Sequence, residues 1–178
     1  MFINPEAVQR DWRAAAEERI TAGKPAPRMT AEDFRAIEQL WGYPLPKEYK
    51  DFMSTWGVVQ FPDAFCGFDY VYQRGDGPRM GFATTINSTK DRKTLELNHT
   101  YLIADPENDS GDPFIPAFML PFAGDPDQNQ ILLELGSDTP RIWFWEDQPD
   151  AFGQGDNTLL GFVADDLVHF INNLRPYP

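Results

Sequence analysis

The sequence contains a single cysteine and no apolar run long enough to cross a bilayer. Cys66 alone cannot form a disulfide within the chain, and one thiol argues against a thiolate metal cluster. The N-terminal residues lack the basic stretch and following apolar segment that mark a secretory signal. We therefore expect a soluble protein of the cytoplasm that does not associate with membranes.

Basic residues are almost missing from the second half of the chain. Residues 94–174 contain fifteen acidic side chains and one basic side chain, Arg141, whereas residues 1–50 contain eight of each kind. The net charge of −13 therefore lies mostly in the second half. Such a field repels nucleic acid and accelerates the encounter with a basic partner. Solubility alone is the more common reason for an acidic surface, and that explanation stays open.

Motifs for catalysis and metal binding are missing as well. His99 and His169 have no metal-ligand spacing, and no nucleophile elbow or glycine-rich phosphate loop occurs. The segment Asp125–Asn129 begins like a calcium loop, but Gln130 stands where glycine is needed and Gly136 where glutamate is needed. We therefore expect no enzyme, no metal and no cofactor. An enzyme with a site assembled from distant carboxylates is the weakest alternative.

The length and composition indicate one folded domain over residues 1–178. Hydrophobic residues make up 42% of the 178 positions, which is enough to bury a core without disulfides. The opening Asn4-Pro5-Glu6 is typical of a helix start, and its thin apolar stripe predicts a helical appendage. With the Pro-rich linker that follows, this appendage covers residues 1–27.

Two further helices are predicted before residue 58. Thr30 is a capping residue for a helix that ends at Gly42. A second helix starts at Pro46 and ends at Gly57, and its apolar residues recur at helical spacing. The face of the first helix is Phe34, Ile37, Leu40 and Trp41, and the face of the second is Tyr49, Phe52, Met53 and Trp56.

Strand patterns fill the middle of the chain. Extended segments are expected at residues 58–61, 68–72, 80–86, 117–123, 131–135 and 142–145. Residues 88–97 fit either a short helix or a pair of strands, and a final amphipathic helix covers residues 164–174. The predicted fold class is α+β: an antiparallel sheet of about five or six strands, with helices packed on one face and helices at both chain ends.

The order of these elements resembles the SUKH superfamily. The resemblance rests on the helix that opens Leu45-Pro-Lys-Glu-Tyr-Lys-Asp-Phe52 and closes on Trp-Gly, and on Met119-Leu-Pro-Phe-Ala-Gly-Asp125 before an acidic turn. Two strands and the closing helix follow, so the resemblance covers about residues 28–176. One departure is the turn Asp125-Pro-Asp-Gln-Asn129, where the family usually has a glycine.

The superfamily includes bacterial immunity proteins and fungal cell-wall regulators. The resemblance therefore implies a non-catalytic immunity protein that binds and neutralises a cognate toxin, frequently a nuclease. A regulatory or scaffolding module of the same fold, with another partner, is the main alternative. The acidic half of the chain would suit the basic surface of a nuclease domain.

The expected binding residues are acids in two polar loops and one aromatic side chain. Trp143 and Trp145 share one face of a strand, with Phe144 on the other, so the strand is either buried on both faces or exposes an aromatic face. The predicted partner-binding residues are Asp105, Glu107, Asp109, Asp112, Trp143, Glu146, Asp147, Asp150 and Asp156.

Overall fold

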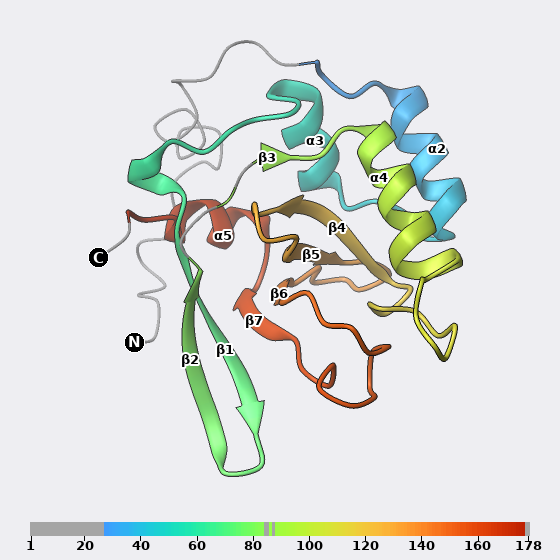
Figure 1. Cartoon of the computed structure of the whole chain (residues 1–178). Helices are drawn as coiled ribbons and strands as arrows, with labels where there is room; N and C mark the ends of the chain where they lie inside the picture. The colour runs from blue at the N-terminus through green and yellow to red at the C-terminus, as the bar shows by residue number, and fades with distance from the viewer. Residues whose placement is uncertain (1–26, 84–85, 87, 177–178) are drawn as a thin grey trace.

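A seven-stranded antiparallel sheet organises the chain in the computed structural model, which describes residues 27–83, 86 and 88–176 (Figure 1). The strand order is β2-β1-β7-β6-β5-β4-β3. The strands are β1 (Phe68–Arg74), β2 (Gly77–Ala83), β3 (Ser88–Thr89), β4 (Met119–Gly124), β5 (Gln130–Glu134), β6 (Ile142–Trp145) and β7 (Gly161–Ala164). The predicted helix within residues 1–27 lies outside the described residues, apart from Pro27.

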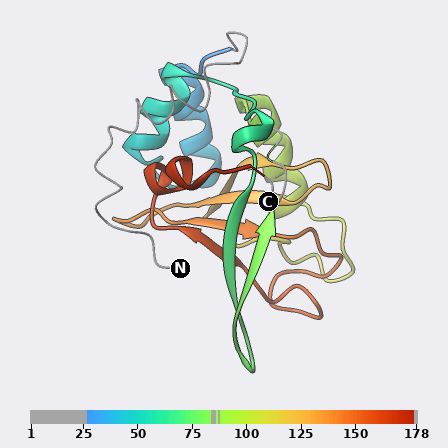
Figure 2. The same ribbon diagram turned by 90° about the vertical axis from the view of Figure 1, so that its left-hand side faces the viewer.

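The helices lie on one side of this sheet, as Figures 1 and 2 show. They are α2 (Ala31–Trp41), α3 (Lys47–Thr55), α4 (Arg92–His99) and α5 (Leu167–Asn173), with short turns η2 (Asp63–Phe65) and η3 (Thr100–Ala104). All neighbouring strands pair antiparallel. The predicted α+β class is therefore confirmed, with seven strands where about five or six were expected.

Short elements account for the differences from the sequence prediction. The expected strand at residues 58–61 forms only an isolated bridge between Gln60 and Ser88. Strand β7 was missed, and its last residue, Ala164, was assigned to the final helix. Residues 88–97 contain both a two-residue strand and the start of α4. Strands this short have too few residues to show the period-two pattern that identifies a strand.

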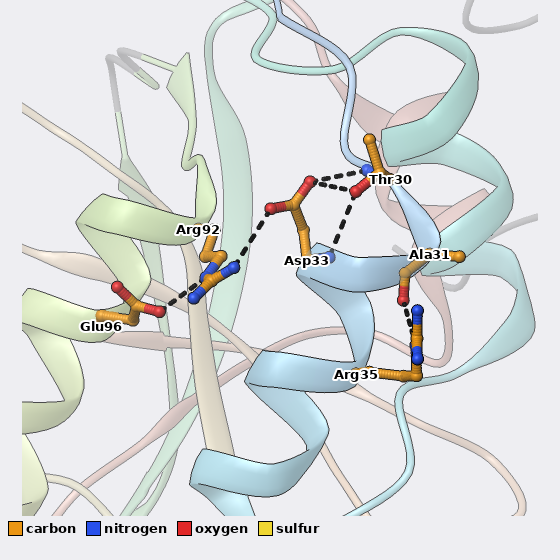
Figure 3. A network of polar contacts seen from close by, with 6 residues as sticks. All are labelled: Thr30, Ala31, Asp33, Arg35, Arg92 and Glu96. Atoms are coloured by element: carbon orange, nitrogen blue, oxygen red, sulfur yellow. Dashed lines mark hydrogen bonds and ion pairs between the residues drawn. The ribbon is translucent and has the colours of Figure 1, made fainter.

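The N-terminus of α2 has the capping arrangement that the sequence predicts. Thr30 Oγ1 accepts a hydrogen bond from Asp33 N at 3.3 Å, and the Asp33 carboxylate accepts one from Thr30 N at 2.8 Å. Arg92 connects this cap to α4, because its guanidinium lies 3.7 Å from Asp33 and donates to Glu96 at 2.7 Å (Figure 3). The hydrogen bonds from Thr30 lower the pKa of Asp33.

The main core lies between the helices and the sheet. Tyr49, Phe52 and Met53 of α3 are buried there, as predicted. Leu40 departs from the prediction, because its side chain is 40% exposed at the outer edge of α2. Trp56 is only partly buried, at the end of α3.

A second, smaller core covers the opposite face of the sheet. Trp145 is 1% exposed and belongs to a cluster with Ile115, Met119 and Leu132. Phe144, the adjacent residue of β6, belongs to the main core. Strand β6 is therefore buried on both faces, and Trp145 is a core residue.

The acidic turn between β4 and β5 contains a strained residue. Gln128 has φ 69°, the only positive φ among the described residues other than glycines. Asp125 holds the turn, since its Oδ1 accepts hydrogen bonds from Asp127 N at 2.9 Å and Asn129 N at 3.0 Å. The left-handed backbone falls in the turn where the resemblance leads one to expect glycine.

Replacing this residue by glycine should stabilise the protein. We expect Gln128→Gly to raise the free energy of unfolding by about 0.5–1 kcal/mol, because relief of the left-handed strain outweighs the greater chain entropy of glycine. Urea unfolding would measure the change. Gln128→Ala keeps the strain and should differ little from the natural protein, and a glycine variant less stable than this control would contradict the prediction.

Candidate partner-binding surface

Two acidic loops contact each other in the folded protein. They are the first acidic loop, residues 105–118, and the second acidic loop, residues 146–160. Phe152 N donates to Pro113 O at 2.9 Å, and Gln154 Nε2 donates to Asp112 Oδ2 at 2.8 Å. The fold thus brings together two acidic segments that are far apart in the sequence.

Asn157 connects these loops to the sheet. It is 1% exposed, and its Oδ1 accepts a hydrogen bond from Trp145 Nε1 at 2.9 Å. Its Nδ2 donates to Phe114 O at 3.0 Å and to Asp150 O at 2.8 Å. Sequence reasoning missed this residue, because its partners come from three segments and no local spacing marks it.

All nine predicted binding residues are partly or fully exposed. Partly exposed members are Trp143 and Asp150, and exposed members are Asp105, Glu107, Asp109, Asp112, Glu146, Asp147 and Asp156. Asp150 is used within its own loop, since its Oδ2 accepts a hydrogen bond from Asp156 N at 3.0 Å. Although Asp147 is exposed as a residue, partial desolvation of its carboxyl group raises its pKa.

Trp143 contacts side chains that are not among the predicted binding residues. Its indole Nε1 donates to Glu134 at 3.2 Å, and the guanidinium of Arg141 lies 5.0 Å from the ring centroid. The ring also packs edge-on against Phe162 at 5.6 Å. With these contacts the indole remains partly exposed.

A groove lies between the β1–β2 hairpin and the second acidic loop. It contains two predicted binding residues, Glu146 and Asp156. Its volume is about 90 Å³, well below the roughly 300–1,000 Å³ of small-molecule pockets, so it suits one side chain of a larger partner. The groove is lined by Tyr70, Tyr72, Arg74, Phe144, Glu146, Gln148, Asp156, Leu159 and Gly161.

The hairpin, which extends beyond the rest of the sheet (Figure 1), contributes residues that sequence reasoning missed. Tyr70 Oη donates to Glu146 Oε1 at 2.7 Å, and burial, followed by the Glu146 contact, raises the pKa of Tyr70. The Arg74 guanidinium lies 5.4 Å from the Tyr72 ring centroid. The alternation Tyr70-Val-Tyr72 places both rings on one face of the strand. This spacing is the feature of the sequence from which the two tyrosines could have been identified.

Two glycines make room for the Tyr70 ring. A Cβ at Gly81 would lie 2.2 Å from Tyr70 Cζ, and one at Gly161 would lie 2.5 Å from Tyr70 Cδ2. These glycines belong to β2 and β7, the strands on either side of β1. The ring therefore lies flat on the sheet, against Phe144 at 4.7 Å, and forms the wall of the groove.

Both histidines have structural contacts. His99 packs edge-on against Trp41 at 4.7 Å, and burial lowers the pKa of His99. His169 Nδ1 lies 2.8 Å from Asp166 Oδ2 at the start of α5. Within the part of the chain that the structure describes, no three His, Cys, Asp or Glu side chains gather as a metal site requires. No helix there is long and apolar enough to span a membrane.

Helix α3 contains Tyr49 and Phe52 of the stretch on which the SUKH resemblance rests. The family model described as SMI1 / KNR4 family (SUKH-1) matches residues 28–173. The chain therefore belongs to the SMI1/KNR4 family, which confirms the resemblance seen in the sequence. A comparison with curated proteins finds no match.

Proposed function

We propose that the protein is an immunity protein that binds and neutralises a basic toxin domain, for which a nuclease is the best-fitting class. The observation that carries this proposal is the groove and its acidic surroundings. Glu146 and Asp156 line a concavity with aromatic walls, and Asp112 lies in the adjoining first acidic loop. Aromatic side chains beside charges are typical of residues that anchor a protein partner.

Membership of the SMI1/KNR4 family supports a role in protein binding. The charge pattern adds a preference for the partner, because a nuclease needs Lys and Arg to contact phosphates and would present them to this surface. The small groove volume supports recognition of a macromolecule over conversion of a small substrate.

Reversing the groove charges should weaken partner binding strongly. The partner would first be isolated with the tagged protein from a lysate of its native host at low salt and identified by mass spectrometry. We expect Glu146→Lys/Asp156→Lys to weaken its affinity about 100-fold, near 2.7 kcal/mol, and to reduce the salt dependence of binding. Isothermal titration at two salt concentrations would measure both effects.

The matched control is Glu32→Lys/Asp127→Lys, which changes the net charge equally at two exposed positions outside the groove. We expect less than a threefold loss from this control, through the overall field alone. Equal losses in the two double variants would contradict a docking role for the groove. Recovery of several unrelated housekeeping proteins would instead favour a regulatory module.

A further inference from the structure

A second and larger pocket lies between the start of α3, the β5–β6 turn and the segment that leads into α5. Its volume is about 380 Å³, within the range of roughly 300–1,000 Å³ that small ligands occupy. It shares no residue with the groove. The lining residues are Pro46, Glu48, Tyr49, Leu133, Asp138, Thr139, Pro140, Arg141, Asp165, Asp166, Leu167 and Val168.

The pocket combines an apolar interior with an acidic rim. Leu133 and Leu167 are buried, whereas Glu48, Asp138 and Asp165 are exposed. Glu48 and Asp138 have no hydrogen bond or ion pair with another residue in the described part of the chain, whereas Asp165 interacts electrostatically with Arg141. Unpaired carboxylates beside an apolar surface make a strongly negative local potential.

The single basic side chain in the lining, Arg141, is shared between Asp165 of this rim and Glu134. Arg141 donates to both carboxylate oxygens of Glu134, at 2.9 and 3.3 Å, and its guanidinium lies over Trp143. Asp166 is also engaged, because it caps α5 through His169 N at 2.7 Å. The carboxylates without a partner are therefore Glu48 and Asp138, and Asp165 is partly compensated by Arg141.

Tyr49 supplies an independent sign of a missing partner. It lines the pocket and is 0% exposed, and its hydroxyl has no hydrogen-bond partner among the described residues. A buried hydroxyl without a partner is uncommon in a folded protein, because phenylalanine would fill the same space without the desolvation cost. Tyr49 is also part of the Leu45–Phe52 stretch on which the family resemblance rests.

We propose that this pocket binds an organic cation, an ammonium or guanidinium group carried on an apolar stem. The stem packs on Leu133 and Leu167, and the charged group pairs with Glu48, Asp138 and Asp165. The Tyr49 hydroxyl has almost no accessible surface, so its oxygen accepts a hydrogen bond from an N–H of the ligand only when neighbouring side chains shift on binding. This inference does not depend on the immunity role, because it concerns a different surface.

Three probes that share one ring and differ in charge would test the pocket. Benzylamine, benzyl alcohol and benzoate are cationic, neutral and anionic, and each would be titrated into ¹⁵N-labelled protein. We expect saturable shifts of the Leu133 and Leu167 amide signals with benzylamine, at least tenfold weaker binding of benzyl alcohol, and none of benzoate. Equal binding of the three probes, or no saturable shift with benzylamine, would overturn the proposal.

Variants locate the binding energy within the pocket. We expect Glu48→Gln/Asp138→Asn to weaken benzylamine binding about tenfold, whereas Glu32→Gln/Asp127→Asn, a control outside the pocket, leaves it unchanged. Tyr49→Phe should bind benzylamine several-fold more weakly, yet unfold at no lower temperature than the natural protein. A Phe variant that binds benzylamine normally would overturn the role of the hydroxyl.

Comparing N-acetylarginine amide with benzylamine would distinguish a cation on a protein partner from a free amine. Tighter binding of N-acetylarginine amide than of benzylamine would support the basic side chain of a protein partner. The reverse order would support a free amine. If the groove variants fail to affect any partner while benzylamine still binds here, the proposed immunity function fails and this site stands.

Discussion

Gly57→Ala is expected to lower the free energy of unfolding by about 3–5 kcal/mol, which makes it one of the most damaging single changes in the chain. Gly57 has φ 69°, and a Cβ there would lie 2.2 Å from Pro27 O and 2.8 Å from Pro27 C. These are backbone atoms of the segment that enters α2. That segment is fixed, because Met29 N donates to Met53 O at 3.1 Å.

Gly42 provides the matched control. It also ends a helix with a positive φ, 75°, but a Cβ there would have no atom within 4 Å. Gly42→Ala should therefore cost only the left-handed strain, about 1–2 kcal/mol. Urea unfolding of both variants separates backbone strain from the clash with Pro27. Equal stabilities would show that the segment at Pro27 moves aside freely.

The second large effect is expected at Asn157. Replacing it by alanine removes the partners of Trp145 Nε1, Phe114 O and Asp150 O. Each buried polar group left without a partner costs about 1–3 kcal/mol, and solvent entering the loops would satisfy part of the loss. We therefore expect Asn157→Ala to lower the free energy of unfolding by about 3 kcal/mol, measured by urea unfolding.

Gln154→Ala is the control for this change. Gln154 lies in the same loop and donates one exposed hydrogen bond to Asp112, so its removal should cost less than about 1 kcal/mol. Hydrogen exchange would add a local readout, since Asn157→Ala should expose the amides of Phe114 and Phe152 before those of β5. Equal effects of the two substitutions would contradict the bridging role of Asn157.

The two predictions concern a residue at the end of a predicted helix, Gly57, and a residue in a polar loop, Asn157. Gly57 ends a helix that the sequence predicts, and its importance beyond the helix cap comes from the approach of Pro27. Asn157 belongs to a loop that the sequence marks only as polar. In both cases the size of the expected effect depends on a contact between segments that no local pattern reveals.

The helices and the core strands were predictable because their signals are local. The cap formed by Thr30 and Asp33 involves residues three apart, and the apolar face of α3 repeats within one short segment. Strand β7 was missed because four residues carry too little periodicity. The buried faces of β6 were undecided for another reason. Alternation shows which side chains share a face, but not what covers it.

Some residues of the candidate site were likewise predictable from the sequence, and others were not. The sequence identified Glu146 and Asp156 from their charge and loop position, and the structure places both in the groove. It did not identify Tyr70, which reaches Glu146 across 76 positions of the chain. Trp143, which was also predicted as a binding residue, contacts Glu134 and Arg141.

The sequence by itself determined the helix caps, the apolar faces, the concentration of acidic charge and the family of this protein. Each of these depends on residue types or on spacings of a few positions. Only the tertiary structure decided that β1 lies beside β7, that Asn157 connects two loops to Trp145, and that Tyr49 lines an acidic pocket. The physical reason is that such contacts depend on chain segments folding against one another, and nothing within either segment specifies its distant partner.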